Sequence, residues 1–529
     1  MKKPSTHNIQ ISYVELGENR IIIVVMKKVL VITLALVVLA TSLSAAPSIE
    51  RYMAPSAQYG SSDSNSSAQQ AASLSEMLYA LGNLYSYLDT NFLYEIDSQK
   101  MQDAVISAMI DSLGDKYSYY ITPEDAQEFS EETTGKYVGI GIYLTKVNPA
   151  YIDWNDPSTY MVIITSPFPG APADRAGLRS GDMISHVNGV EIYEMDATEA
   201  SKLIRGKENT PITLTIHRGS SEFEVTLMPE EITSPSTEKG IIADTVGYIR
   251  ILEFSQTTQE SFRSDVEELL SKGAESFIID LRNNRGGSVD SALGIANMFI
   301  PDGKTLMTTK FKEKSNNKDT VYTSTGYLAV DENVPVVLLV NGGTASASEI
   351  LTGALRDNDR ALIVGSQTFG KGIMQFTIAF MGGYLNITVA HYYTPSGADI
   401  HEVGIAPDYI VDVDEEYSDE EMEAYSAFLK ETYLEDWLEE YPDYTKENII
   451  AFAEHHKDSG VPEELLQLLM RNEYIYSLDY DKRPVADLDF DTQLIKAVEV
   501  VKSGITVEEY EKQQQAMSPE VTVSEVSVI

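Results

Sequence analysis

Three mostly apolar runs, each followed by a polar turn, constrain the fold of this chain more than any other feature. The runs are Ser276–Leu281, Val336–Val340 and Ala361–Gly365. Strands buried on both faces, as in a parallel sheet covered by helices, have this continuous pattern rather than an alternating one. Helix-forming segments at Thr258–Ser271 and Ser348–Asn358 precede the first run and separate the last two. The pattern predicts an α/β layer in this part of the chain.

The remainder of the 529 residues divides by local pattern, because one hydrophobic core does not extend over so long a chain. Apolar residues recur at helical spacing after residue 73, and short strands with glycine turns follow residue 137. We expect an upstream segment with a signal peptide or anchor (1–46), a flexible linker (47–72), a helical region (73–136), a small β module (137–231), the α/β core (232–412) and an acidic helical extension (413–529).

The charge and the composition exclude several classes of function. The net charge is −42 and the pI is near 4.4, so a nucleic-acid partner would be repelled. The chain has no cysteine, which excludes disulfides and thiolate nucleophiles, and no paired histidine motif predicts a metal site. We therefore expect neither a metal nor a cofactor. The extension carries 30 acidic and nine basic residues, but its recurring apolar residues predict helices rather than a disordered tail.

The N-terminal region has the pattern of an export signal. Lys27 and Lys28 precede the uncharged apolar run Val29–Ala40, and the small residues Thr41–Ala46 follow it. The apolar and small residues together are also at the short end of what can span a membrane, so a cleaved signal and a retained anchor are both open. With Met26 as the start of the signal, we expect an exported protein, in a periplasm or at the outer face of the cytoplasmic membrane.

Ser346 lies at the junction between the second apolar run and a helix, in the turn Asn341–Ser348. A helix N-terminus offers backbone N–H groups without partners beside such a hydroxyl. An acyl-transfer nucleophile needs this setting, because the amides can stabilise a developing oxyanion. The alternative is structural: Ser346 or Ser348 caps the helix.

Lys371 lies between two glycines in an otherwise apolar stretch, Thr368–Gln375. Desolvation lowers the proton affinity of a partly buried lysine, which can then act as a neutral base and activate a serine. The alternative is an exposed lysine on a glycine turn. A phosphate-binding loop is excluded because the upstream glycine and the following hydroxyl residue are missing. None of the seven histidines has surroundings that favour the commoner serine–histidine triad.

A third polar turn, Asp280–Gly287, follows the first apolar run and ends in two glycines. Glycine lets the backbone approach a ligand closely, so its N–H groups could complete an oxyanion hole. An ordinary strand-to-helix turn is the alternative.

Together these three segments resemble the C-terminal processing peptidases, the tail-specific serine proteases of peptidase family S41. The resemblance covers about residues 75–412 and implies a ClpP/crotonase-like protease core. It implies Ser346 as nucleophile, Lys371 as base and Gln375 as the residue that orients the lysine. It also implies oxyanion-hole donors at Ala347 and at Gly287, with Gly286 close by. Arg285 stands where the family often has proline, and we expect only a surface effect from it.

The β module resembles a PDZ domain, through Pro172–Leu178, Gly181–Ile184 and Val187–Gly189. The resemblance implies a carboxylate-binding loop made of Val138, Gly139, Ile140, Gly141 and Ile142. A peptide would add as a strand beside this loop, with its terminal carboxylate held by backbone N–H groups. The alternative is a PDZ fold that serves only as a lid or spacer.

These features predict a multidomain α/β serine endopeptidase that recruits protein or peptide substrates by their C-termini. The rival interpretation is a catalytically inactive scaffold that binds peptide tails through its PDZ module. The helices at 73–112 and the acidic extension are candidate surfaces of a homodimer.

Overall fold

The computed structural model describes residues 66–147, 149, 152, 154–412, 417–478 and 482–517. The predicted export signal lies outside the described residues. The chain forms two compact units, residues 1–105 and 106–529. In the described part of the first unit, α2 (Ser66–Asn91) is followed by most of α3 (Ser98–Asp111), and apolar side chains of α2 such as Leu78 and Leu84 are exposed. No helix in the described ranges has the length and apolarity needed to cross a bilayer.

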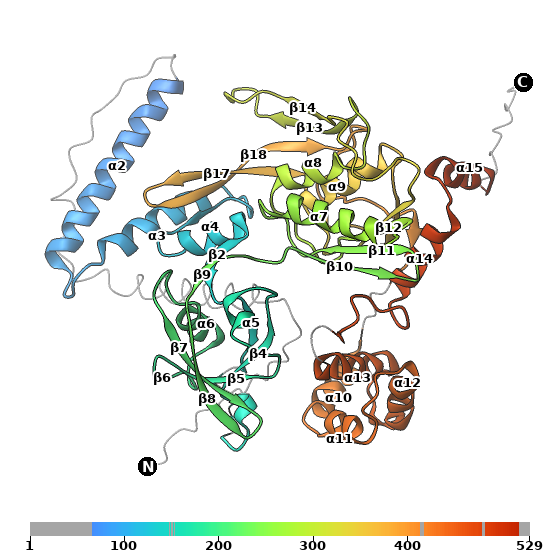
Figure 1. Ribbon diagram of the computed structural model, residues 1–529. Coiled ribbons are helices and arrows are strands. Elements are labelled where there is room, and N and C mark those ends of the chain that lie inside the picture. Colours follow the sequence, from blue (N-terminus) through green and yellow to red (C-terminus); the bar gives the residue numbers. More distant parts are fainter. Residues whose placement is uncertain are drawn as a thin grey trace, which may run out of the picture. The chain divides into compact units, whose positions relative to one another are not determined.

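The second unit contains a six-stranded sheet, of which β10, β11 and β12 are labelled in Figure 1. Its strand order is β10-β11-β12-β15-β16-β19, and the strands are parallel except for the antiparallel edge strand β10. The strands are β10 (Thr237–Ile242), β11 (Val246–Ile251), β12 (Ser276–Asp280), β15 (Val336–Val340), β16 (Leu362–Gly365) and β19 (Tyr409–Ile410). The three apolar runs in the sequence are therefore neighbouring strands, as their continuous pattern predicts.

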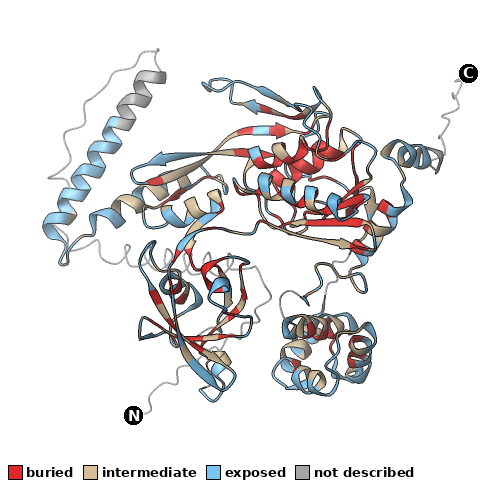
Figure 2. Cartoon of the chain, viewed as in Figure 1, coloured by how far each residue is buried: buried red, intermediate tan, exposed pale blue. Residues whose placement is uncertain are grey.

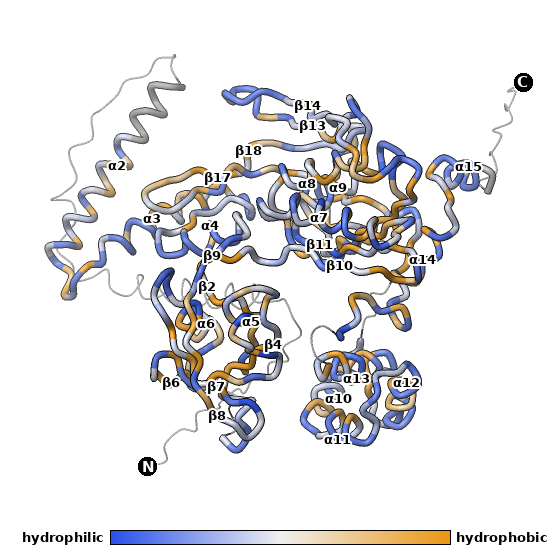
Figure 3. The backbone as a smooth tube through the Cα atoms, in the orientation of Figure 1, coloured by the Kyte–Doolittle hydropathy of each residue, from blue (hydrophilic) through white to orange (hydrophobic). Residues whose placement is uncertain are grey.

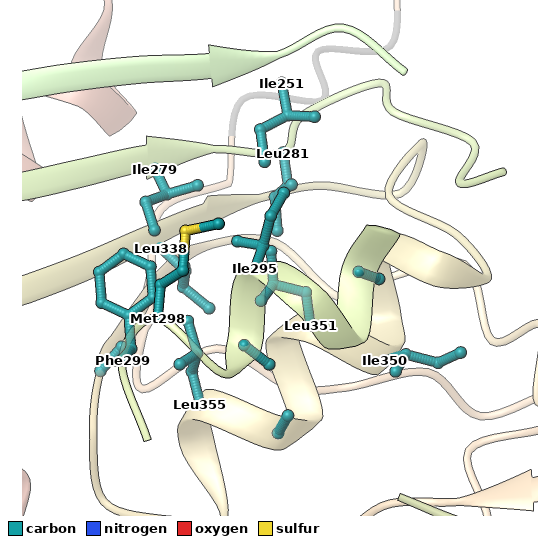
Figure 4. Close-up of a cluster of buried hydrophobic side chains, with 14 of the residues drawn as sticks. Ile251, Ile279, Leu281, Ile295, Met298, Phe299, Leu338, Ile350, Leu351 and Leu355 are labelled. Atoms are coloured by element: carbon teal, nitrogen blue, oxygen red, sulfur yellow. The ribbon is translucent and has the colours of Figure 1, made fainter. Parts of the chain in front are cut away.

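One face of this sheet packs against three helices, α7 (Thr258–Ser271), α8 (Val289–Ala296) and α9 (Ala347–Arg356). Alternate strand residues such as Ile279 and Leu338 contribute to this core with Phe299 and Leu351 (Figure 4). Figure 2 shows the buried residues concentrated in these strands and in α8 and α9. Burial on this scale fixes the strand ends, and with them the turns that carry the candidate site.

The opposite face of the sheet is covered by α14 (Thr492–Ser503), which belongs to the acidic extension. Leu494 and Val501 pack against strand residues that include Val337. The Arg282 guanidinium, just after β12, also pairs with Asp491 at the start of α14, at 2.7 Å. Within the described part of the acidic extension, α14 therefore belongs to the core of the six-stranded sheet.

The first part of the extension forms a small helical bundle of its own. Its helices are α10 (Asp419–Phe428), α11 (Tyr433–Glu440), α12 (Lys446–His455) and α13 (Glu463–Ser477). They enclose a separate core around Phe452, Leu466 and Tyr474. Hydrophilic and hydrophobic stretches alternate along these helices (Figure 3), as the amphipathic sequence pattern predicts. Two further helices of the described chain are α4 (Ala126–Thr134) and α15 (Val507–Met517).

A second sheet borders the core and has the order β1-β18-β13-β14, with β17 paired to β18. Its strands are β1 (Tyr119–Ile121), β13 (Thr305–Phe311), β14 (Thr320–Thr323), β17 (Ile373–Phe380) and β18 (Gly383–Tyr393). All neighbours in it are antiparallel. Because β17 begins two residues after Lys371, this sheet fixes the far end of the lysine segment.

The β module is a five-strand path with the order β3-β4-β5-β7-β8, with β6 paired to β5. The strands are β3 (Ile142–Thr145), β4 (Val162–Pro167), β5 (Met183–Val187), β6 (Val190–Glu191), β7 (Ile212–Arg218) and β8 (Ser221–Leu227). Two helices accompany them, α5 (Pro172–Arg175) and α6 (Ala197–Arg205). A separate strand pair, β2 (Lys136–Gly139) with β9 (Glu230–Thr233), joins the two ends of the module. The edge strand β3 has β4 as its only neighbour among the described strands.

Candidate active site

Three turns meet at the carboxyl ends of the parallel strands β12, β15 and β16. These strands are adjacent and in register, with Asp280 beside Leu339 and Val340 beside Gly365. The carboxyl ends of neighbouring parallel strands open at the same edge of a sheet, which is where ligand sites form in α/β folds. The segments ending in Gly287, Ser346 and Lys371 therefore converge although they are far apart in the sequence.

Ser346 is the N-cap residue of α9 and has an unusual backbone conformation, with φ 56° and ψ −117°. A residue other than glycine in such a region costs on the order of 1–3 kcal/mol, which the surrounding structure must offset. The side chain is partly exposed, whereas its neighbours Ala345 and Ala347 are buried. This turn places the hydroxyl at the surface directly before a helix N-terminus.

The fully buried carboxylate of Glu349 connects the serine turn to the lysine segment. Its Oε2 accepts the backbone N–H of Ser346 at 2.9 Å and that of Lys371 at 2.8 Å. Its Oε1 accepts the backbone N–H of Gly370 at 2.8 Å and the hydroxyl of Thr368 at 2.6 Å. A buried carboxylate is stable only when it is fully hydrogen-bonded, and four donors meet that need here.

Tyr392 provides a second connection between the two segments. Its buried hydroxyl donates to the carbonyl oxygen of Lys371 and lies 3.1 Å from the carbonyl oxygen of Ser346. The backbone N–H of Phe369 also donates to the carbonyl of Thr344, at 3.0 Å. The positions of the serine and the lysine are thus set by several independent contacts.

The side chain of Lys371 is partly buried and lies over an aromatic ring. Its Nζ is 4.9 Å from the ring centre of Tyr117. Burial lowers the pKa of the Lys371 amine below its ordinary value, while the carboxylates of Asp115 and Glu349 act in the opposite direction. The net direction favours the neutral amine that a general base requires.

Gly286 and Gly287 lie against the serine turn, and both have positive φ, 97° and 135°. A Cβ atom on Gly286 would be 2.7 Å from the nitrogen of Ala347 and 2.8 Å from the Cβ of Ser346. Gly287 pairs with Phe254 in a parallel bridge, in which Phe254 donates to Gly286 and accepts from Ser288. In such a bridge the N–H of the middle residue, Gly287, points away from the paired strand.

The hydrogen bonds around this turn divide the three candidate donors into two groups. The N–H of Gly286 donates to Oδ1 of Asn284 at 2.9 Å, so it is already used. In the described part of the chain, no hydrogen bond uses the N–H of Gly287 or of Ala347. The geometry therefore leaves the N–H groups of Gly287 and Ala347 as the two available donors. Gly286, which has no side chain, allows the glycine turn to lie close to the serine turn.

Asn284 holds the glycine turn to the serine turn. Its buried carbonyl accepts the N–H of Ala345 and the hydroxyl of Ser348, both at 3.0 Å, and its Nδ2 donates to Ile251 at 2.7 Å. The hydroxyl of Ser348 therefore helps to hold the two turns together. The partly exposed Ser346 makes no such hydrogen bond to Asn284 in the described structure.

Gln375 lies on β17, and its Nε2 is 3.3 Å from the hydroxyl of Thr388 on β18. Thr388 is in turn bound through its N–H to the hydroxyl of Ser118, at 3.0 Å. Within the described residues, Gln375 and Lys371 share no hydrogen bond. Gln375 belongs to the sheet that holds the lysine segment.

The β module contains a pocket of about 90 Å³ between the edge strand β3 and helix α6. Ile140, Gly141 and Ile142 are among its lining residues, as are Leu144 and Arg205. Val138 and Gly139 instead lie on β2, paired with Glu231 and Glu230 of β9, and do not line the pocket. Three of the five residues expected in the binding loop thus border a groove.

Sequence reasoning missed the contributions of Glu349, Tyr392, Asp115 and Tyr117. Glu349 had a local signal, because Ser346 and Glu349 have the spacing of a capping box. The other three have none, since their contacts with the lysine segment are long-range. No group of three acidic or histidine side chains in the described ranges is arranged to hold a metal ion.

Two segments of the chain match known protein families. Residues 245–411 match the peptidase family S41, and residues 163–218 match the PDZ domain. A "Probable CtpA-like serine protease" of Staphylococcus aureus (strain COL) is 38% identical over 339 residues, which are 63% of this chain and 65% of that protein. The protein of the same name from Staphylococcus haemolyticus (strain JCSC1435) is 33% identical over 325 residues, 61% of this chain and 62% of its own length.

Among solved structures, the photosystem II D1 C-terminal processing protease is 29% identical, with a TM-score of 0.36, and the match covers 62% of this chain and 86% of that one. The chain spans slightly less than two thirds of the length of the two staphylococcal relatives. The domain matches confirm the expected fold class, a mixed α/β core of the S41 type with a PDZ module and helical regions.

Proposed function

We propose that this chain, whose residues 245–411 match peptidase family S41, is a serine endopeptidase with Ser346 as nucleophile and Lys371 as general base. One observation carries the proposal. The backbone N–H groups of Ser346 and Lys371 donate to the same oxygen of the buried Glu349. A nucleophile and its base must be held at a fixed distance and orientation, and the shared carboxylate oxygen fixes the backbone of both residues.

In the proposed reaction the neutral Lys371 amine takes the proton of the Ser346 hydroxyl as Oγ attacks the substrate carbonyl carbon. The carbonyl oxygen becomes an oxyanion, which the N–H groups of Ala347 and Gly287 stabilise. The C–N bond then breaks, and the leaving amine receives the proton from Lys371. Water hydrolyses the acyl-enzyme with Lys371 again as the base, which releases the new carboxylate and restores Ser346.

We propose that Gln375 supports Lys371 indirectly, by stabilising the strand that follows the lysine segment. Its contact with Thr388 ties β17 to β18, and β17 continues directly from the lysine segment. The amide would keep this strand in position during the reaction rather than act on the substrate.

The PDZ module recruits a substrate C-terminus in this proposal. The pocket beside β3 and the position of that strand at the end of the described strand order support β-augmentation by an extended peptide. Ile140, Gly141 and Ile142 would surround the terminal carboxylate. The substrates are proteins or peptides outside the cytoplasm, a location supported by the export pattern at Lys27–Ala46.

Hydrolysis of casein by the purified chain tests the proposal. We expect the wild-type chain to cleave casein and both Ser346→Ala and Lys371→Ala to be inactive, whereas Ser348→Ala, which alters a structural hydroxyl, retains the chemistry at reduced stability. Cleavage by Ser346→Ala at the wild-type rate would refute the assignment. Peptide binding without any cleavage by the wild-type chain would support the inactive scaffold instead.

A further inference from the structure

The amine of Lys371 rests against a segment that lies more than 250 positions earlier in the chain. Tyr117 is partly buried, and the centre of its ring is 4.9 Å from Nζ of Lys371. A cation near the face of an aromatic ring is attracted by the ring quadrupole, and the ring also excludes water from one side of the amine. The exposed Lys116 also lies 4.9 Å from the same ring centre.

The segment that carries Tyr117 is held rigidly by Asp115. Oδ1 of Asp115 accepts the N–H of Tyr117 at 3.0 Å, and Oδ2 accepts the hydroxyl of Ser118 at 2.6 Å. These bonds close a tight turn of the kind that aspartate side chains form with the following backbone.

The same turn is hydrogen-bonded to strand β18, which pairs with the strand β17 that follows the lysine segment. The hydroxyl of the buried Ser118 accepts the N–H of Thr388 at 3.0 Å. The carbonyl of Tyr117 accepts Nδ2 of Asn386 at 3.2 Å. Thr388 is also the residue that binds Gln375, so the ring of Tyr117 and the strand after Lys371 are fixed by one set of contacts.

We propose that Tyr117 and Asp115 are positioning residues for the reaction: the Tyr117 ring is a platform that holds the Lys371 amine in place, and the Asp115 carboxylate fixes that platform. This inference rests on the proposed role of Lys371 as the base. It adds a helical-region segment to the site, outside the residues 245–411 that match the peptidase family.

Burial and the charged groups around the amine determine the direction in which the pKa of Lys371 is shifted. Burial lowers the pKa of Lys371, and the carboxylates of Asp115 and Glu349 raise it. The pKa of Asp115 lies below its ordinary value: although burial raises it, hydrogen bonds from Ser118, Thr388 and Tyr117 and the charge of Lys371 outweigh that effect. Removing the ring would take away its attraction for the charged amine and would also admit water to the amine, so the expected effect is on kcat, whereas removing the Asp115 charge should favour the neutral form.

The test measures the pH dependence of kcat and KM for a peptide substrate. Four variants of the full chain are compared with the wild type. We expect Tyr117→Leu to lower kcat about tenfold, the order of a desolvated cation–aromatic contact, with KM little changed. Tyr117→Phe keeps the ring and should behave as the wild type. Asp115→Asn keeps an acceptor for the Tyr117 N–H and should move the acid limb to lower pH. Tyr119→Leu, a neighbouring exposed tyrosine, is the matched control.

Two results would overturn the inference: a wild-type kcat in Tyr117→Leu, or a loss in Tyr117→Phe as large as that in Tyr117→Leu. If Tyr117→Leu does not fold, Asp115→Asn decides, because an unmoved acid limb in that variant contradicts the proposal. A Lys371→Ala chain assayed in parallel distinguishes failure of the proposed base from failure of the proposed Tyr117 platform. Its full activity would refute the proposed base, whereas its inactivity beside an unaffected Tyr117→Leu would refute the platform alone.

Discussion

Ser346 and Lys371 donate their backbone N–H groups to one and the same oxygen atom, Oε2 of Glu349. The two residues come from different turns, at the ends of β15 and β16, so the shared oxygen fixes the distance between the turns rather than the shape of either. Thr368 and Gly370 bind the other oxygen of the same carboxylate. Glu349 is therefore the structural centre of the candidate site.

Replacing Glu349 should damage both activity and stability. In Glu349→Gln an amide NH₂ group would face backbone N–H donors, and the buried donors left without an acceptor would each cost about 1–3 kcal/mol. We expect kcat/KM to fall by about two orders of magnitude or more, in line with the loss of catalytic positioning, and the melting temperature to drop. Steady-state kinetics and thermal unfolding measure the two effects.

Glu421 provides the matched control for that variant. It occupies the same capping-box position at the start of α10, where it accepts from Ser418 at 2.7 Å, but it belongs to the helical bundle. Glu421→Gln should leave kcat/KM unchanged. Equal losses in the two variants would mean that Glu349 acts only as a helix cap.

The pH dependence of the wild-type chain should show an acid limb due to Lys371. Because burial lowers the pKa of this amine, the neutral form becomes available below the pH at which an exposed lysine loses its proton. Activity should therefore fall as the pH decreases and the amine takes up a proton. Lys371→Arg should be inactive at every pH that the fold tolerates, since a guanidinium does not deprotonate. Activity in this variant would contradict the general-base role.

Gly286 should tolerate no side chain. A Cβ there would lie 2.7 Å from the nitrogen of Ala347, beside the proposed oxyanion-hole donor. Gly286→Ala should lower kcat by about two orders of magnitude, the scale of losing an oxyanion-hole donor.

Gly273→Ala separates this effect from backbone strain. Gly273 has nearly the same φ, 93° against 97°, but a Cβ on it would meet no atom within 4 Å. Both variants should lose roughly 1 kcal/mol or more of stability from the positive φ, and only Gly286→Ala should lose activity. A normal kcat in Gly286→Ala would place the oxyanion elsewhere.

The groove of the PDZ module should control recruitment rather than chemistry. Leu144 lines the pocket on the edge strand β3, so Leu144→Lys should raise KM for substrates with a free apolar C-terminus and leave kcat unchanged. Val190→Lys, on β6 of the same sheet and already exposed, is the control. Substrates with an amidated C-terminus should not distinguish these two variants; a difference between them would argue against carboxylate recognition.

The sequence predicted what depends on local patterns, and it missed what depends on distant contacts. The mostly apolar runs were sufficient to predict the buried strands. The order of the motifs was sufficient to predict that the segments of Ser346 and Lys371 converge. Tyr117 could not be found, because its segment reaches the lysine through long-range contacts with β18, which include the pairing of β1 with β18. Nor does the acidic composition of residues 413–529 reveal that α14 covers the second face of the sheet. Apolar residues at helical spacing predict a helix but not its partner.

Covalent labelling of the full chain by a fluorophosphonate probe tests the central claim most directly, because the probe reacts with an activated serine. Mass spectrometry of the digested protein identifies the modified residue and gives its rate of labelling. The proposed mechanism predicts one adduct, on Ser346, at a rate that rises with pH and is lost in Lys371→Ala. An adduct on another serine, or labelling of Ser346 in Lys371→Ala at the wild-type rate, would contradict it.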